Sequence, residues 1–299
     1  MSLFVEQSSS TCDFKGSESW VILSPIEQSI KQKIESVGTP LKDWNINIYR
    51  GVLTGYNTAF IIDTAKRDEI LANCKTADEK KRTAELIRPI LRGRDIKRYG
   101  YDWADLWLIN THNGIKGKLP RIKIEDYPAV KAHLDEHWDK IEKRADQGDT
   151  PYNLRNCAYM EDFFTQRIVY GQFQDGAEYS FAEEGIFLSS NEYMLITKNY
   201  SAKCLLAFLN SKIIEWLLSI TTGSLGGNAK IGQKSNFLKL PIPKLPEKQQ
   251  AEFDSIVDKI LKVKKEHKEA AEIEEVVDSK LYKFYSLTPE EIDFIETQI

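Results

Sequence analysis

Three prolines within six residues separate this chain of 299 residues into two unequal parts. Pro241, Pro243 and Pro246 each fix a backbone φ angle and lack an N–H donor, so this segment predicts a stiff, extended connector. Beyond the connector, apolar residues recur at heptad spacing, interrupted by His267 and Glu274. The apolar heptad positions are Phe253, Ile256, Ile260, Val263, Ala270, Val277, Leu281 and Phe284. This spacing predicts a helical hairpin or a coiled-coil stretch over residues 245–299.

Residues 21–244 carry both helix and strand signals, which indicates an α+β fold. Ser24 and Glu27 form a capping box, and Thr288 with Glu291 forms a second one before a short last helix. Periodicity predicts further elements: helices at 25–37, 64–73, 77–87, 127–145 and 201–219, and strands at 106–110, 166–173, 186–189 and 193–197. Residues 46–62 predict two strands around a tight connection that glycine permits. We expect residues 1–20 to be a tail or a boundary within a longer polypeptide.

The charge of the chain is unevenly distributed. Asp and Glu number 45 and Lys and Arg 41, a net charge of -4, which argues against an extensive basic face for nucleic acid. However, residues 86–123 hold 9 basic and 3 acidic side chains, whereas residues 245–299 hold 8 basic and 14 acidic ones. Positive charge is therefore local, and the acidic excess lies in the C-terminal helices.

Cysteine usage and hydropathy indicate a cytoplasmic protein without a membrane partner. The 4 cysteines lie far apart and form no CxxC pair, as expected in a reducing compartment without a disulfide framework or a metal site. No segment approaches the roughly 20 apolar residues of a membrane span, and no signal peptide is recognisable.

Motifs for catalysis are incomplete. Residues 227–235 resemble a P-loop with one residue too many, because Lys234 does not directly follow Gly232. A Pro-Pro pair and a glycine-rich cofactor loop, which an adenine methyltransferase needs, are both missing from the sequence. His133 and His137 share a helix face but lack an evident third metal ligand, so a solvated face is the simpler interpretation. Asp95 and Lys97 would supply half of a metal-dependent nuclease site, an alternative that stays open.

Three polar constellations remain as candidate binding segments. The first displays Thr54, Tyr56 and Asn57 next to Gly51 and Gly55; the alternative is a plain hairpin in which Asn57 caps the turn. The second is a cluster of basic side chains within eleven residues. Guanidinium groups bind phosphate and the O6/N7 edge of guanine, so this cluster is a candidate DNA contact. The alternative is a charged, solvent-exposed face that is partly paired with Asp95. Its members are Arg88, Arg92, Arg94, Lys97 and Arg98.

The third constellation is a polar, basic loop over residues 223–234. Its Asn228 and Gln233 suit adenine, and Lys230 and Lys234 suit guanine or phosphate, although an ordinary flexible loop is the alternative. Aromatic residues that alternate at strand spacing favour a core role over a stacking platform. They are Tyr170, Phe173, Tyr179, Phe181, Phe187 and Tyr193.

Several of these pieces occur in one order: Gly51–Asp63, Ile87–Tyr99, Leu205–Lys212, Leu240–Pro243 and Leu281–Ile292. In this order they resemble the Taq-like C-terminal target-recognition domain of type IIG restriction-modification enzymes and N6-adenine DNA methyltransferases. The connector and the following helix also resemble the spacer of type I specificity subunits. The likeness covers nearly the whole chain from about residue 20.

The resemblance implies a mixed α/β DNA target-recognition domain at residues 21–244 and a helical spacer or docking region at residues 245–299. It implies double-stranded DNA and the missing N-terminal methyltransferase or nuclease portion as partners. The chain alone is expected to be non-catalytic and without a cofactor, whereas the parent enzyme would use S-adenosylmethionine and Mg²⁺. The expected DNA-contacting residues are Thr54, Tyr56, Asn57, Arg92, Arg94, Lys97, Arg98, Asn228, Lys230, Gln233 and Lys234. The rival functions are a protein-interaction module using the acidic C-terminal helices, and the nuclease around Asp95 and Lys97.

Overall fold

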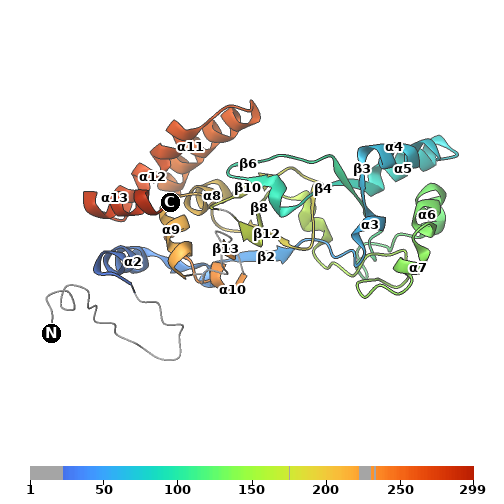
Figure 1. The fold of residues 1–299 in the computed structure, drawn as a ribbon, viewed down its shortest axis with the longest axis horizontal. Helices are drawn as coiled ribbons and strands as arrows, with labels where there is room; N and C mark the ends of the chain where they lie inside the picture. Colours follow the sequence, from blue (N-terminus) through green and yellow to red (C-terminus); the bar gives the residue numbers. More distant parts are fainter. Residues whose placement is uncertain (1–22, 175, 222–229, 232–233) are drawn as a thin grey trace, which may run out of the picture. The chain divides into compact units, whose positions relative to one another are not determined.

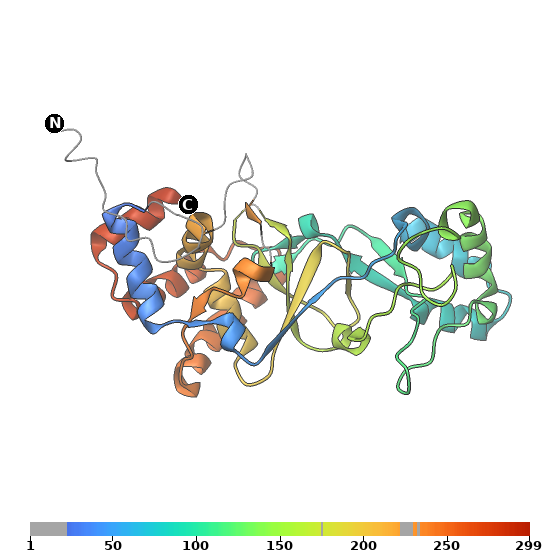
Figure 2. The ribbon, with the colours of Figure 1, turned by 90° about the horizontal axis from the view of Figure 1, so that it is seen from below.

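The computed structural model describes residues 23–174, 176–221, 230–231 and 234–299, which form two compact units (Figures 1 and 2). The helical unit contains the described residues up to Ile46, Gln174–Ala177 and Thr197–Ile299. The sheet unit contains Asn47–Phe173 and Glu178–Ile196. Helices and small sheets together make the α+β fold that the sequence predicted. The boundaries expected at residues 20 and 244 separate segments of different expected function, whereas the two units described here are defined by their compactness. The functional boundaries therefore stay a prediction.

The helical unit is built on a short strand pair and a set of amphipathic helices. The connector forms β14 (Pro241–Ile242), which pairs antiparallel with β1 (Thr39–Pro40), so the predicted extended segment is confirmed. The predicted hairpin is also confirmed, because α11 (Glu247–Lys265) packs on α12 (Ala271–Phe284). The other helices are α2 (Pro25–Val37), α8 (Ala202–Leu209), α9 (Lys212–Thr221), α10 (Lys234–Phe237) and α13 (Pro289–Gln298).

The helix predicted over residues 201–219 is broken into α8 and α9, which are bent by 61°. Ser211 explains the break, because its hydroxyl donates to the carbonyl of Phe208 and accepts from the N–H of Ile214. The Lys212 N–H donates to Asp278 on α12, which fixes the start of α9. Among the described helices, none alone has the length and apolar content of a membrane span, and α8 with α9 passes that test only as a bent pair.

The sheet unit contains two four-stranded sheets. The order of the first is β10 (Tyr179–Ala182), β8 (Arg167–Gly171), β12 (Glu192–Thr197) and β2 (Ile46–Arg50). The order of the second is β11 (Phe187–Leu188), β4 (Ile87–Leu91), β7 (Leu106–Ile109) and β3 (Ile61–Asp63). Its helices are α3 (Asn57–Phe60), α4 (Thr64–Ala72), α5 (Ala77–Leu86), α6 (Pro128–Asp135) and α7 (Trp138–Ile141). A short hairpin joins β5 (Ile96–Lys97) to β6 (Gly100–Tyr101).

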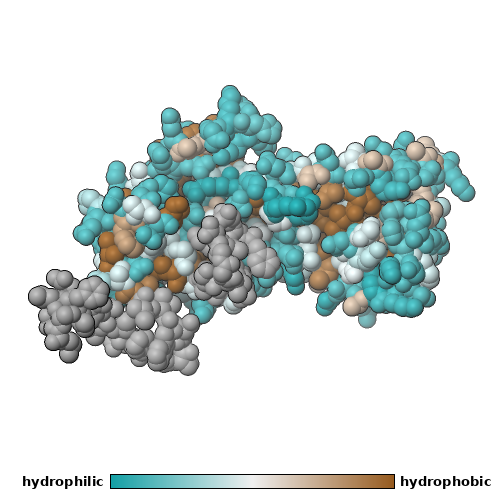
Figure 3. Space-filling view, in the orientation of Figure 1, coloured by the Kyte–Doolittle hydropathy of each residue, from teal (hydrophilic) through white to brown (hydrophobic). Residues whose placement is uncertain are grey.

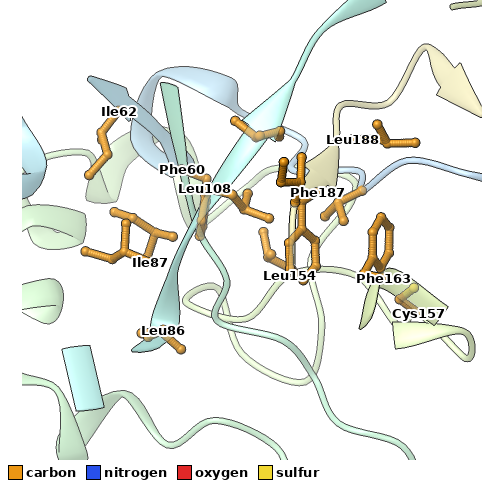
Figure 4. Packing of buried hydrophobic residues seen from close by; sticks show 14 of the residues in the cluster. Phe60, Ile62, Leu86, Ile87, Leu108, Leu154, Cys157, Phe163, Phe187 and Leu188 are labelled. Atoms are coloured by element: carbon orange, nitrogen blue, oxygen red, sulfur yellow. The ribbon is translucent and has the colours of Figure 1, made fainter. Parts of the chain in front are cut away.

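One apolar core connects the elements of the sheet unit (Figure 4). Phe163 and Phe187 stack with ring centroids 4.4 Å apart, and Phe60 and Leu108 are fully buried. Tyr170 and Tyr179 are also buried, which supports the core interpretation of the alternating aromatic residues. On the face seen in Figure 3 the surface is mainly hydrophilic, with an exposed apolar patch beside β4.

Two predictions of local structure were wrong in the sheet unit. Residues 46–62 do not form a hairpin, because β2 and β3 belong to different sheets and α3 lies between them. The helix predicted over 127–145 divides into α6 and α7, since the N–H of His137 bonds to the carbonyl of Leu134, an i to i−3 bond that tightens and ends α6.

A carboxylate on α13 holds the two ends of the helical unit together. Glu291 accepts from the hydroxyl of Ser29 at 2.7 Å and from the ammonium of Lys33 at 2.6 Å, both on α2, and from the N–H of Thr288 at 2.7 Å. These bonds to the charged form lower the pKa of Glu291 to about 2, against burial, which acts in the opposite direction.

We expect Glu291→Gln to lower the unfolding free energy by roughly 1–3 kcal/mol at neutral pH, because charge-assisted bonds are lost. The folded-state pKa is lowered, so this stabilisation is present above the ordinary value of 4.5 and is lost as pH falls toward 2. Urea unfolding at several pH values measures both effects. A variant with the acid sensitivity of the wild type would contradict this role for Glu291.

Candidate functional site

The segment Gly51–Asn57 begins at a close approach of two backbones. The N–H of Gly51 donates to the carbonyl of Glu192, and the N–H of Val52 donates to the carbonyl of Leu188, each at 2.8 Å. A Cβ at position 51 would lie 1.9 Å from the carbonyl oxygen of Ser189. Glycine is therefore required here for backbone proximity, and these bonds direct the chain away from the hairpin that the sequence predicted.

The three predicted contact residues of this segment differ in accessibility. Thr54 is buried, and its hydroxyl donates to the side-chain oxygen of Asn57. Tyr56 is half-buried, with its ring edge-on to His137 at 6.0 Å between centroids. Asn57 is exposed. Thr54 is thus a support for the loop, whereas Asn57 and part of Tyr56 are open to a ligand.

Arg144, which the sequence analysis missed, fixes this segment to the loop that follows α7. Its guanidinium is buried and donates to the carbonyls of Thr54, Asp146, Pro151 and Asn153. It also lies over the ring of Phe60, 4.5 Å from the centroid. Burial lowers the pKa of Arg144 to about 10, so the side chain stays charged at neutral pH. A buried arginine that binds several loop carbonyls stabilises the loop conformation. No local sequence motif predicts this role for Arg144.

The arginines of the basic turn at residues 92–98 differ in how far the described residues engage them. Arg92 forms a two-bond ion pair with the buried Asp95, at 2.7 and 3.0 Å. Lys97 lies 3.4 Å from Glu178, and Arg98 is half-buried. Arg94 is exposed and makes no hydrogen bond or ion pair with any described residue. Of the predicted contacts here, Arg94 is the side chain most available to an anionic ligand.

Glu192 brings the starts of these two segments together. Its carbonyl binds Gly51, while one carboxylate oxygen accepts the N–H of Gly93 at 2.7 Å and the other accepts the hydroxyl of Ser189. The residue is 4% exposed, and burial raises the pKa of its carboxyl, although the hydrogen bonds from Ser189 and Gly93 act in the opposite direction. One buried acid therefore sets the position of both candidate segments.

A projecting loop that carries basic residues was also missed as a unit. The finger, residues 113–121, is drawn as a green loop in Figure 2. It has exposed Lys116 and Lys118 at its tip and an antiparallel bridge between Ile115 and Leu119. It borders a cleft of about 780 Å³, whose other wall includes Asn156 and Cys157. The signal available in the sequence was the basic excess of residues 86–123 combined with two glycines at the loop, Gly114 and Gly117.

The third predicted constellation lies mostly outside the described residues. Asn228 and Gln233 are not described. Lys230 belongs to the short strand β13 (Lys230–Ile231), and Lys234 is exposed at the start of α10. These positions belong to the helical unit, and their role as DNA contacts stays a prediction.

The geometry of Asp95 and Lys97 does not resemble a nuclease site. Both carboxylate oxygens of Asp95 are bound by Arg92, and the ammonium of Lys97 faces Glu178. His133 is buried with one ring nitrogen 3.0 Å from the carbonyl of Ala59, and burial lowers its pKa. Within the described part of the chain, no group of three His, Cys, Asp or Glu side chains is placed to hold a metal ion.

Comparison with known proteins gives the class. Residues 88–242 match the family described as the TaqI-like C-terminal specificity domain. A solved structure of the type IIL restriction-modification enzyme MmeI in complex with DNA has a TM-score of 0.62 at 12% identity, over 87% of this chain and 36% of that chain. The type IIG restriction endonuclease BpuSI gives a TM-score of 0.47 at 15% identity, over 79% and 28%. The sequence has no significant match among curated proteins.

The family match gives the class of this chain, a specificity domain of the kind found in restriction-modification enzymes. The family match covers more than half of the sequence, and this chain belongs to the TaqI-like C-terminal specificity domains. It spans only about a third of the length of the MmeI chain, and the shared fold is that of the matched part.

We expect Glu192→Ala to lower the unfolding free energy by roughly 1–3 kcal/mol, because it leaves the partly buried N–H of Gly93 without its acceptor. Glu192→Gln keeps an acceptor and is the matched control. The folded-state pKa of Glu192 is raised, so its contribution to stability is present at acidic pH and is lost as pH rises through that pKa.

Glutamine resembles the neutral form of Glu192, which burial favours, so Glu192→Gln should be at least as stable as the wild type at neutral pH. This difference in stability should disappear near pH 4.5, where the carboxyl of the wild type becomes protonated. Thermal unfolding followed by circular dichroism over this range measures the difference. Equal destabilisation by alanine and glutamine at pH 7 would disprove the acceptor role.

Proposed function

We propose that this chain selects the DNA target of a restriction-modification or phage-defence enzyme and performs no catalysis itself. The observation that carries the proposal is the family match over residues 88–242, a segment that contains the exposed Arg94 and the finger. MmeI, whose fold this chain shares, was solved in complex with DNA, which supports DNA as the partner. Catalysis would belong to an N-terminal methyltransferase or nuclease portion that uses S-adenosylmethionine and Mg²⁺, in the cytoplasm.

The division between positioning and reading follows from the side chains. Phosphate contacts from exposed Arg and Lys give affinity that depends on salt, and a few side chains on supported loops discriminate bases. Arg94 fits the first role, because it is exposed and lies on a turn fixed by Arg92, Asp95 and Glu192. Asn57 fits the second role, since an amide pairs well with adenine.

Titration of a fluorescent random duplex by anisotropy at two salt concentrations tests the proposal. We expect binding that weakens steeply with salt, in the non-specific range of roughly 10⁻⁴–10⁻⁶ M. A gel of the same samples with Mg²⁺ should show intact DNA. Cleavage that Asp95→Ala abolishes would replace the proposal with the nuclease.

A second candidate is protein interaction through the acidic C-terminal helices. Val276 and Phe284 on α12 are 45% and 37% exposed and lie eight residues apart, on one side of the helix. This candidate would gain support if the chain bound no DNA at low salt and instead bound a partner protein without salt dependence.

We expect Arg94→Glu to weaken binding to random duplex and to reduce the slope of log K against log salt by about 0.9 for the lost phosphate contact. Lys140→Glu is the control, because Lys140 is an exposed cation on α7, 3.5 Å from Asp139. Arg92→Glu is unsuitable as a probe, since it would break the buried pair with Asp95. Equal affinity of the wild type and Arg94→Glu would remove this turn from the interface.

A further inference from the structure

The finger is a preformed turn and not a slack loop. The N–H of Ile115 donates to the carbonyl of Leu119 at 2.7 Å, and the N–H groups of Lys118 and Leu119 donate back to the carbonyl of Ile115 at 3.0 and 2.9 Å. Gly114 and Gly117 have φ angles of 74° and 76°, a region that other residues adopt at a cost. The sequence of the finger therefore specifies one tight turn, closed by a single β-bridge.

The base of the finger is fixed to the body of the sheet unit. The Asn113 amide donates to the Asp149 carboxylate at 2.9 Å and accepts the N–H of Asp149 at 2.8 Å. The N–H of Ile122 donates to the carbonyl of His112 at 3.1 Å, which closes the loop beneath the bridge. Because the tip is already ordered, a ligand that binds it has less conformational entropy to remove.

The charges of the finger are available to an anionic partner. Lys116 is exposed and makes no hydrogen bond or ion pair with any residue that the structure describes. Lys118 pairs with Glu161, and Arg121 pairs with Asp149 at 3.2 Å, but all four side chains are more than a third exposed. Such surface pairs contribute little free energy, so a phosphate can replace the carboxylate at a small cost.

We infer that the finger enters the major groove of the DNA target, with Lys116 donating to a guanine and Lys118 or Arg121 contacting flanking phosphates. The major groove is wide enough for a two-stranded β-ribbon, so it can also admit this narrow bridged turn, and lysine is a donor suited to the O6 and N7 acceptors of guanine. The cleft of about 780 Å³ beside the finger leaves room for the sugar-phosphate edge. The inference rests on the proposed DNA recognition and assigns it a base-reading residue.

The test begins with selection of duplexes from a random pool by the 299-residue chain. Each guanine of the selected duplex is then replaced, one at a time, by 7-deazaguanine, which lacks the N7 acceptor. Affinities are measured for the wild type, Lys116→Ala and the control Lys140→Ala.

At one guanine we expect the replacement to lower the affinity of the wild type and of the control Lys140→Ala for the duplex by about 5-fold or more. About 5-fold corresponds to the lower end of the free energy of a base contact. The affinity of Lys116→Ala should not change on the same replacement. Gly117→Ala keeps the lysine but strains the tip, so it should weaken binding to the selected duplex as Lys116→Ala does.

Four results would overturn the inference. The first is that 7-deazaguanine lowers the affinity of Lys116→Ala as much as that of the wild type at every guanine, while the slope of log K against log salt falls by about 0.9 in the variant. Lys116 would then contact phosphate and read no base. If neither the response nor the slope changes, the finger lies outside the interface. If the chain binds DNA in a salt-sensitive way but selects no sequence, base reading fails while DNA binding stands. Absence of any DNA binding at low salt would instead reject the proposed function itself, and the inference with it.

Discussion

The hydrogen bonds of one buried residue, Glu192, hold the two candidate segments in position. Its carbonyl accepts a hydrogen bond from the N–H of Gly51, and its carboxylate accepts one from the N–H of Gly93. The segment 51–57 and the basic turn are therefore both attached to β12 near their first residues. A buried charge is tolerated only where hydrogen bonds compensate its lost hydration, and here Ser189 and Gly93 supply them. Both glycines lie against this region, because a side chain at position 51 would collide with Ser189 and one at position 93 would approach Glu192 at 3.1 Å.

Irregular loops near the surface are made rigid by buried arginines. Arg144 binds four backbone carbonyls around the 51–57 segment, and Arg167 binds the carbonyls of Thr165, Glu183 and Ile186. Burial lowers the pKa of each guanidinium to about 10, which keeps both charged at neutral pH. Loops held in this way satisfy their polar groups without regular strands and keep exposed side chains in place, as a specificity domain needs.

Among the cations of the sheet unit, two groups have contrasting roles. Arg92, Arg144 and Arg167 are bound by protein groups and support the fold. Arg94 and Lys116 are exposed without a partner among the described residues and are free for a ligand. A net charge of -4 is therefore compatible with a local site that binds an anionic ligand, because only exposed cations contribute to such binding.

Local signals in the sequence determined much of the fold. The capping boxes at Ser24 and Thr288 begin their helices as predicted, because side chain and backbone partners lie within three residues of each other. Most of the predicted heptad positions are likewise buried: Phe253, Ile256 and Ile260 on α11, and Val277 and Leu281 on α12. The last heptad position, Phe284, is 37% exposed instead. The order of motifs also sufficed to recognise the specificity-domain family.

Only the tertiary structure decided which polar residues support the fold and which stay exposed. Arg92 and Arg94 are equivalent in the sequence, yet Asp95 binds one and leaves the other in solvent. The hairpin predicted at residues 46–62 failed because the partners of Gly51 and Val52 come from residues 188–192, about 140 positions away. Hydrophobic periodicity encodes the local conformation of a segment, but a hydrogen bond between distant segments is set by the packing of the whole unit.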